Sequence, residues 1–296
     1  MGLHHHMLAR LYHPATAVNA IRQSLGWASP DRLRILLHHD IAPHDRANFA
    51  AQLRWLARRW SFVSPVEFAA MVAGDRPVRG RNLLLTFDDG FASNRTVAEE
   101  VLNPMGIRAL FFVVSDLVSL TDRRDVLLFL ARNISLQRDA DCVPAYWDRM
   151  TWPDLAALCE QGHEIGAHTG SHARLSAITD DAVLAQEIVA SADVIAGRLG
   201  TSVDHFSYTF GNLESFSARA MAVARTRFRF VHSGLRGDNV GVPALALRRD
   251  SLASQNQALE YQSFANPLAA AFLEGVADRQ YAGARARLDA WVSETC

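Results

Sequence analysis

The chain has 296 residues, of which 49% are hydrophobic and 21% are charged, a composition typical of a folded globular protein. Its 30 basic and 31 acidic residues leave a net charge of −1, so we expect no nucleic-acid partner. Every basic residue is arginine. The lack of lysine excludes a phosphate-binding loop of the Walker type, a Schiff-base enzyme and a lysine general base.

The sequence carries no mark of export or of a membrane anchor. The three cysteines have no metal-type spacing, and an odd count fits a reducing compartment better than a disulfide scaffold. The N-terminal segment lacks the apolar core, about 7–15 residues long, of a signal peptide. No apolar run approaches the ~20 residues of a transmembrane helix. We therefore expect a cytoplasmic protein, with an export route that leaves no sequence mark as the alternative.

Short apolar runs alternate with longer segments of helical spacing. Strands are predicted at residues 34–38, 82–87, 108–114, 164–167, 205–210, 228–232 and 244–248. A capping box at Ser64 and a related signal at Thr151 predict two helix starts. Apolar spacing predicts a helix over 180–199, and an Ala-rich helical region is expected over 266–292. This alternation predicts parallel βα units, in an open sheet or a barrel of about seven strands.

Polar residues gather at the predicted carboxyl ends of these strands. They are His38 to Asp40, Asp88 to Gly90, His168, Phe210 to Asn212, His232 and Arg248 to Asp250. In a βα barrel the loops that follow the strands converge at one rim, where active sites are built. The pattern therefore marks these residues as a candidate site.

Two motifs within this set carry specific chemistry. Asp88 and Asp89 follow a buried strand, where adjacent carboxylates are costly unless something pairs with them; a plain Asp-Gly turn is the alternative. His168 and His172 are four residues apart, so both imidazoles can reach one ion, and one carboxylate would complete a three-ligand zinc site. Two histidines without a ligand role are the alternative here.

Together the two motifs resemble those of the polysaccharide deacetylases, also called the NodB-homology family of carbohydrate esterases. The matching residues are Thr86-Phe87-Asp88-Asp89-Gly90 and His168-Thr169-Gly170-Ser171-His172. The resemblance implies a distorted (β/α) barrel of about seven parallel strands. It also implies that Asp88 is the catalytic base, and that Asp89, His168 and His172 hold a divalent metal, with zinc preferred and cobalt or nickel as alternatives.

Three further segments are similar to the exopolysaccharide deacetylase branch, in which the acid histidine precedes the Asp-Asp motif. His39 then takes the role of catalytic acid, with His232 as the alternative. Neighbouring side chains of a strand point to opposite sides, so at most one of His38 and His39 should face the site. Arg249 corresponds to an arginine that orients the catalytic carboxylate, although a surface salt bridge is the competing interpretation. The segment from Ser207 to Asn212 resembles a family loop with Thr209 in place of proline. That loop makes Tyr208, Phe210 and Gly211 candidate substrate-binding residues.

The resemblance covers roughly residues 33–252 and predicts three parts. These are an N-terminal extension over 1–30, the deacetylase domain over 31–262 and a helical extension over 263–296. The insertion at 121–149 between the two motifs is interpreted as a solvated helix and loop, with a cap over the cleft or an anion site as alternatives.

The implied activity is metal-assisted removal of acetyl groups from an N-acetylated carbohydrate, such as an N-acetylglucosamine glycan or its precursor. Hydrolysis of small non-sugar amides by the same fold is the nearest alternative. A catalytically silent carbohydrate-binding member of the family is a second. A non-haem Fe(II) oxygenase, which also uses two histidines and a carboxylate, is the third.

Overall fold

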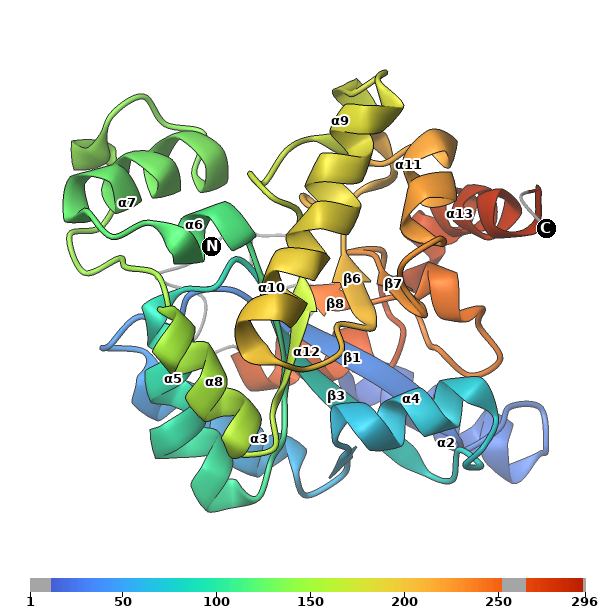
Figure 1. Ribbon diagram of the computed structural model, residues 1–296. Helices are drawn as coiled ribbons and strands as arrows, with labels where there is room; N and C mark the ends of the chain where they lie inside the picture. The colour runs from blue at the N-terminus through green and yellow to red at the C-terminus, as the bar shows by residue number, and fades with distance from the viewer. Residues whose placement is uncertain (1–11, 252–264, 295–296) are drawn as a thin grey trace.

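The computed structural model describes residues 12–251 and 265–294 and contains one parallel sheet ringed by helices (Figure 1). The strand order is β7-β6-β5-β4-β3-β1-β8, with β2 paired to β3 outside this path. The strands are β1 (Arg32–His38), β2 (Ser61–Phe62), β3 (Arg81–Phe87), β4 (Leu110–Val113), β5 (Glu164–Ala167), β6 (His205–Ser207), β7 (Phe230–His232) and β8 (Asp250–Ser251). The sheet curls into a distorted (β/α) barrel, which confirms the predicted fold class.

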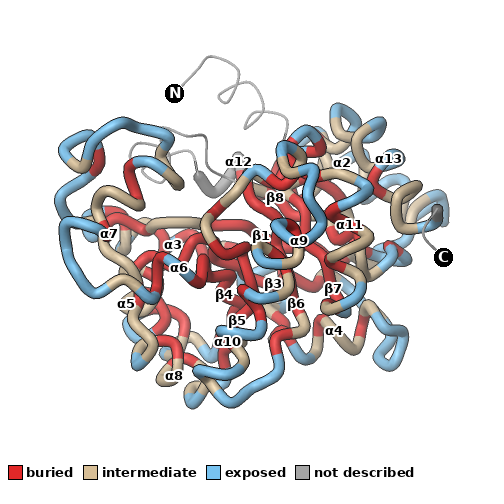
Figure 2. Tube along the Cα trace, turned by 45° about the horizontal axis from the view of Figure 1, so that its top comes forward, coloured by how far each residue is buried: buried red, intermediate tan, exposed pale blue. Residues whose placement is uncertain are grey.

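Both faces of the sheet are buried, which explains why the strands read as continuous apolar runs. One face packs against helix α4 (Pro65–Ala73) in one apolar cluster. The sheet side of the cluster consists of Leu33, Ile35, Leu84, Leu110, Phe112, Phe230 and Leu247, and the helix side consists of Phe68 and Met71 with the preceding Val63. The opposite face packs under the surrounding helices, and its members include Leu36, Leu85, Phe111, Phe206 and Val231. Buried residues accordingly lie at the centre of the molecule, and exposed residues lie on the peripheral helices and loops (Figure 2).

The segment from Leu247 to Ser251 connects the two edges of the curled sheet. Leu247 pairs in parallel with His232 of β7, and β8 pairs in parallel with β1. The strand predicted at 244–248 is therefore wrong. Residues Ala244–Ala246 form a 3-10 turn after Pro243, whose fixed φ favours a turn, and sheet pairing starts only at Leu247.

The other predicted strands exist, with shorter ends in three cases. The run at 205–210 leaves the sheet after Ser207, because the following loop places Phe210 at a positive φ of 63°. The runs at 108–114 and 228–232 shorten to Leu110–Val113 and Phe230–His232. The strands predicted at 34–38, 82–87 and 164–167 match β1, β3 and β5 within two residues.

The helix starts predicted at Ser64 and Thr151 are confirmed, and both are capping boxes. The Ser64 hydroxyl accepts a hydrogen bond from the Glu67 backbone N–H, and the Glu67 carboxylate accepts one from the Ser64 N–H. Thr151 and Asp154 make the same reciprocal pair. These boxes satisfy N–H groups that no helix carbonyl can reach, and so fix where the helices begin.

Helices alternate with the strands along the chain. They are α2 (Tyr12–Ser24), α3 (Arg46–Leu56), α4 (Pro65–Ala73), α5 (Ala92–Val97), α6 (Ser115–Ser119), α7 (Arg123–Phe129), α8 (Trp152–Glu160), α9 (Asp181–Ala185), α10 (Ser191–Leu199), α11 (Ala218–Ala224), α12 (Ala265–Leu273) and α13 (Ala282–Glu294). The helix predicted over 180–199 contains a π-helical stretch, Gln186–Ala190, between α9 and α10. None of the helices within residues 12–251 and 265–294 combines the length and apolarity needed to cross a bilayer.

The helical region predicted after residue 265 consists of two helices, α12 and α13, separated by a 3-10 turn. Arg34 of β1 connects this region to the sheet. Its guanidinium donates to both carboxylate oxygens of Asp250 at 2.8 Å, to Asp278 at 2.8 Å and to the Phe272 carbonyl at 2.8 Å. The three predicted domain boundaries stay predictions, but this contact joins the C-terminal helices to the barrel.

Replacing Arg34 should destabilise the whole fold. Arg34→Met leaves the fully buried Asp250 without its bidentate partner, and breaking a buried ion pair in this way costs about 3–5 kcal/mol. Urea unfolding followed by circular dichroism measures the loss. The control is Arg219→Met, which removes an exposed pair with Asp181 and should leave the unfolding midpoint unchanged. Equal midpoints for the two variants would contradict the role of Arg34.

Candidate active site

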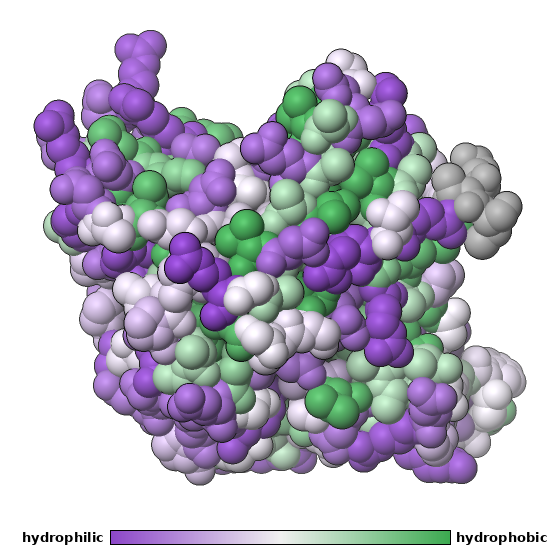
Figure 3. Space-filling model, in the orientation of Figure 1, coloured by the Kyte–Doolittle hydropathy of each residue, from purple (hydrophilic) through white to green (hydrophobic). Residues whose placement is uncertain are grey.

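A cleft of about 740 Å³ opens at the carboxyl ends of the strands. Predicted site residues from five loops line it: His39, Asp88, Asp89, His168, His172, Phe210, Gly211 and Arg249. The space-filling view is hollowed in this region, between the lobe that carries α7 and the lobe that carries α9 (Figure 3). The structure therefore brings together at one rim residues that are up to 210 positions apart in the sequence.

Strand alternation explains why these side chains face the cleft. On β3, Leu84 and Thr86 face the inner side of the barrel, and the same parity continues to Asp88. On β5 the same parity passes through Gly166 to His168. A Cβ on Gly166 would lie 2.6 Å from the Phe112 ring, so only glycine lets β5 and β4 pack this closely.

Arg249 holds Asp88 in a buried, bidentate ion pair. Nη1 donates to Asp88 Oδ1 at 2.7 Å, and Nη2 donates to Oδ2 at 2.8 Å. Arg249 also donates to the Ser207 hydroxyl at 2.6 Å and to the Ser233 carbonyl at 2.8 Å. Because Arg249 is fully buried, its contact with the Asp88 carboxylate is a buried ion pair and no surface salt bridge.

This pair also sets the charge of Asp88. Burial alone raises the pKa of the carboxyl, but the Arg249 and His168 charges lower it by more, so the pKa lies below its usual range. Asp88 is thus a carboxylate near neutral pH, although solvent hardly reaches it.

Asp89, His168 and His172 form a compact donor set. Asp89 Oδ1 lies 3.4 Å from Nε2 of His168 and 3.5 Å from Nε2 of His172. Among the described residues, this is the one group of three or more His, Cys, Asp or Glu side chains whose ligand atoms all lie within 4.8 Å of one another. Asp89 and His172 hold backbone φ values of 73° and 63°, a strained conformation that directs both side chains into one place.

Two backbone carbonyls fix which imidazole nitrogens face Asp89. His168 Nδ1 lies 2.6 Å from the Ser207 carbonyl, and His172 Nδ1 lies 2.7 Å from the Asn133 carbonyl. A carbonyl oxygen only accepts, so both Nδ1 atoms carry a proton, and Nε2 is the nitrogen that each imidazole turns towards Asp89. Burial lowers the pKa of His172 to about 4, which keeps its imidazole neutral, whereas for His168 burial is outweighed by the neighbouring Asp88 and Asp89 carboxylates, which raise its pKa. Two Nε2 atoms and a carboxylate oxygen without a hydrogen-bond donor are a ligand set that suits a divalent cation.

His39 faces this group, whereas His38 does not. His39 lines the cleft just past the end of β1, and its charge contributes to lowering the pKa of both Asp88 and Asp89. Its Nδ1 is buried and makes no hydrogen bond with any described residue. His38 is fully buried and packs edge-on against Phe49 at 5.1 Å. The expected alternation of the two histidines is what the structure shows.

His232 lies away from the cleft, inside the barrel. Its Nε2 is 2.9 Å from His205 Nδ1, and its ring packs on Phe68 and Phe112. The side chain is fully buried and does not line the cleft. The structure thus gives no support to His232 as the alternative acid.

The predicted substrate loop divides into core and cleft residues. Tyr208 is fully buried and stacks on Phe216 with ring centroids 4.3 Å apart, so the prediction that it touches substrate does not fit its position. Phe210 and Gly211 line the cleft, at φ values of 63° and 67°. Thr209, in the place of the family proline, donates to the Ala173 carbonyl at 2.5 Å, a contact that restrains the loop.

Several supporting residues were not predicted from the sequence. Ser207 was assigned to a strand, yet its hydroxyl contacts Arg249 and its carbonyl orients His168. Its place at the start of the segment from Ser207 to Asn212, which resembles the family loop, was the available signal. Asn133 lies in the insertion, where Asn133-Ile134-Ser135 matches a glycosylation sequon but gives no sign of a contact with His172. The insertion lines the cleft through Ile134 to Gln137, Cys142 and Trp147, so the expectation of a solvated helix and loop gives way to the alternative of a cap beside the cleft.

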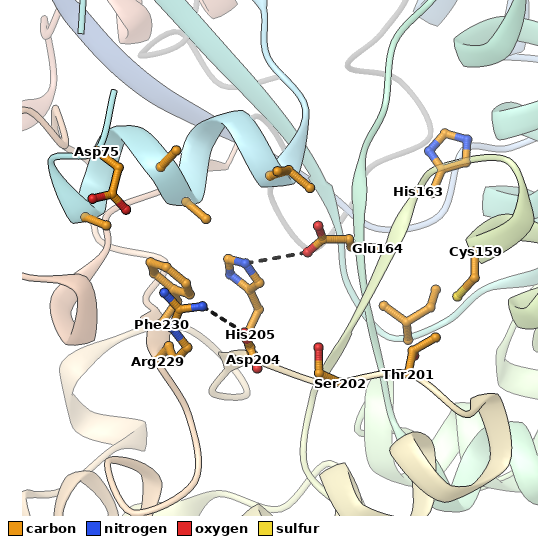
Figure 4. Close-up of a pocket in the computed structure, with 15 residues that line it drawn as sticks. Asp75, Cys159, His163, Glu164, Thr201, Ser202, Asp204, His205, Arg229 and Phe230 are labelled. Atoms are coloured by element: carbon orange, nitrogen blue, oxygen red, sulfur yellow. Dashed lines mark hydrogen bonds and ion pairs between the residues drawn. The ribbon is translucent and has the colours of Figure 1, made fainter. Parts of the chain in front are cut away.

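A second pocket lies at the opposite, amino-terminal end of the strands (Figure 4). There His205 and Glu164 point towards each other, with Nε2 and Oε2 3.7 Å apart, and Arg229 pairs with Asp204. The pocket contains no group of three ligand atoms that could share a metal, among the described residues. This end of a βα barrel stabilises the fold, and the donor set lies at the other end.

Removing Arg249 should expose its structural as well as its chemical role. Arg249→Met leaves Asp88 buried and unpaired, which should cost about 3–5 kcal/mol in urea unfolding. The double variant Arg249→Met/Asp88→Asn removes the unpaired charge as well, so it should be more stable than the single arginine variant. If the loss in free energy of unfolding of the double variant equals the sum of the losses of the two single variants, the two side chains are not coupled.

Comparisons with known proteins agree with this geometry. The family model described as polysaccharide deacetylase matches residues 75–227, just over half of the chain. The Bacillus subtilis (strain 168) protein named "Putative polysaccharide deacetylase YxkH" is 22% identical over 156 residues. That match covers 51% of this chain and 47% of YxkH, so the chain spans about half the length of this relative.

Several solved structures share the fold. IcaB from Ammonifex degensii superposes with a TM-score of 0.63 at 22% identity, over 82% of this chain and 97% of IcaB. Streptococcus pyogenes deacetylase PplD, solved with acetate, gives a TM-score of 0.59 at 18% identity, over 79% of this chain and all of PplD. The BpsB deacetylase domain from Bordetella bronchiseptica gives 0.59 at 20% identity, over 76% of this chain and 98% of that domain. With the matched family model, these findings show that the chain belongs to the polysaccharide deacetylase family.

Proposed function

We propose that this protein is a metal-dependent hydrolase that removes acetyl groups from N-acetylated sugars, in a glycan of the N-acetylglucosamine type or its precursor. The observation that carries the proposal is the placement of a donor set, Asp89, His168 and His172, beside a carboxylate held by Arg249. Family membership supports the choice of deacetylation among the reactions such a site could perform.

The donor set fits a cation with two imidazoles and one carboxylate, which leaves positions for water and substrate. Zinc suits these ligands best, and cobalt or nickel would also be accepted. A cation held there polarises a carbonyl oxygen and lowers the pKa of water. The protein supplies the rest: two carbonyl-oriented imidazoles, one buried carboxylate and a cleft open to a carbohydrate chain.

Asp88 is the proposed general base. It adjoins the donor set, since its Oδ2 lies 3.8 Å from His168 Nε2, yet its strongest partner is Arg249. The arginine fixes the orientation of the carboxylate and keeps it ionised, so it can accept a proton from water as the water attacks the acetamide carbonyl carbon. Arg249 is thus a positioning residue that acts through Asp88.

His39 is the proposed general acid. Breaking the C–N bond requires a proton on the departing amine, and the donor must face the same cleft from another side. His39 meets this condition, because it lines the cleft from the β1 loop, whereas Asp88 follows β3. The Asn94 amide donates to the His39 carbonyl at 2.8 Å and so holds the histidine backbone in place.

The donor set and the Asp88 carboxylate paired with Arg249 are all present, which favours an enzyme over a silent binding member of the family. Thr209 stands where the family has proline, and its hydrogen bond to the Ala173 carbonyl restrains the loop in place of the proline ring. Small non-sugar amides stay the second candidate substrates. A comparison of acetate release from N-acetylglucosamine oligomers, sugar nucleotides and linear amides separates these classes.

The base and the ligands should respond differently to substitution. Asp88→Asn keeps the donor set, so bound zinc or cobalt should stay near the wild-type content while acetate release from N-acetylglucosamine oligomers falls roughly 10²–10⁴-fold. His172→Ala should lose both metal and activity. Metal analysis of the purified variants and an acetate assay measure the two effects. Near-normal turnover of Asp88→Asn would overturn the assignment of the base.

The acid assignment makes a separate prediction. His39→Gln removes a proton donor but leaves the metal ligands intact, so kcat should fall roughly 10²–10⁴-fold and bound metal should not change. His44→Gln, the same replacement at an exposed histidine outside the cleft, is the matched control and should keep full activity. If His39→Gln and His44→Gln turn over equally fast, the proton comes from another group.

A further inference from the structure

The insertion, residues 121–149, has a small core of its own. It contains α7, a π-helical stretch (Leu130–Ile134) and a 3-10 turn (Ala140–Cys142). Its apolar side chains pack with those of the loops after β3 and β4 in a cluster separate from the barrel core, whose buried members are Phe91, Val114, Leu117, Val126 and Leu130. The insertion is therefore an ordered unit that can present residues to the cleft.

One residue of the insertion contacts the loop from His168 to His172, which we call the His loop, at two points. The Asn133 carbonyl accepts the hydrogen bond from His172 Nδ1 at 2.7 Å, and the Asn133 amide donates to the Ser171 carbonyl at 2.9 Å. On its other side the His loop is held by Glu187, which accepts hydrogen bonds from the Ser171 N–H and hydroxyl. The His loop is thus clamped between the insertion and the π-helical stretch that carries Glu187.

The residues next to Asn133 form one wall of the cleft. Ile134, Ser135, Leu136 and Gln137 all line it. Leu136 is 59% exposed and has a φ of 54°, a left-handed conformation that is unfavourable for a leucine side chain. Strained backbone conformations cluster at ligand-binding sites, so the exposed Leu136 side chain at this cleft is a candidate for contact with a ligand.

We propose that residues 133–137 form a strap that joins substrate contact to the orientation of a metal ligand. Asn133 is a positioning residue, which sets the direction of the His172 imidazole through its carbonyl and holds the His loop through its amide. Leu136 is a specificity residue, whose side chain packs on the apolar face of a sugar ring in the cleft. The second role rests on the proposed function, whereas the first requires only that the donor set binds a cation.

The geometry gives the two residues separable effects. Groups that orient a metal-bound histidine typically change metal affinity by about 10- to 100-fold when removed. Leu136 makes no hydrogen bond to the His loop, so its side chain should affect substrate affinity and not metal affinity. Asparagine tolerates the left-handed region better than leucine does, so Leu136→Asn removes the apolar contact without adding backbone strain.

The first test measures zinc affinity of the full chain by competition with a chromogenic chelator. Asn133→Ala keeps the backbone carbonyl that accepts from His172 but removes the side-chain amide that holds the Ser171 carbonyl, so the orientation of that backbone carbonyl towards His172 is no longer secured and zinc binding should weaken about 10-fold or more. Asn103→Ala is the matched control, because it removes an amide that bonds Gln161 near the opposite end of the barrel, and should bind zinc like the wild type. Thermal unfolding of both variants checks that each is folded at the assay temperature.

The second test measures steady-state kinetics on a soluble N-acetylglucosamine oligomer. Leu136→Asn should raise KM roughly tenfold, because the side chain no longer contributes apolar surface that the sugar covers. Its zinc affinity should equal that of the wild type. Asn133→Ala, assayed at saturating zinc, should keep a KM near the wild-type value.

The outcomes distinguish this inference from the proposed function. A wild-type protein that binds no zinc and releases no acetate overturns both. A wild type that binds zinc and releases acetate, with unchanged zinc affinity in Asn133→Ala, overturns the strap alone. An unchanged KM in Leu136→Asn overturns its role as a specificity residue.

Discussion

The ion pair between Arg249 and Asp88 connects the closure of the barrel to the chemistry of the site. Arg249 lies between Leu247, which pairs with β7, and Asp250, which pairs with β1. Its side chain points inward to Asp88, and the next side chain, Asp250, points outward to Arg34. Each buried charge requires its partner, so a shift of this segment by one residue would leave both pairs broken. The register that joins the sheet edges therefore also orients the carboxylate.

Around this pair, the rim is built from short loops in conformations that cost free energy. Asp89, Thr169, His172 and Phe210 all have φ values between 63° and 73°. Such residues persist only where neighbouring contacts hold them, and here backbone carbonyls and the Glu187 carboxylate supply those contacts. The strain brings three donor atoms together from two loops. For the same reason we expect substitutions outside the donor set to alter the site.

The family relationship accounts for the barrel and the motifs, and the insertion forms one wall of the cleft. A barrel core packed on both faces leaves little freedom at the strands, whereas a loop with a separate apolar cluster can vary without disturbing the sheet. Contact between that loop and His172, a proposed metal ligand, gives a physical route by which changes in the insertion would act on the donor set.

The sequence by itself determined the βα alternation, both capping boxes and the residues of the donor set, because these depend on local periodicity and short motifs. It also indicated that His39 and His38 face opposite sides, since strand alternation is a local property. Only the tertiary structure decided that Ala244–Ala246 turn before the sheet pairing starts, that Tyr208 is buried, and that His232 lies inside the barrel. The same holds for the contact between Asn133 and His172, 39 residues apart, because a backbone carbonyl has no sequence signature and its partner is chosen by packing.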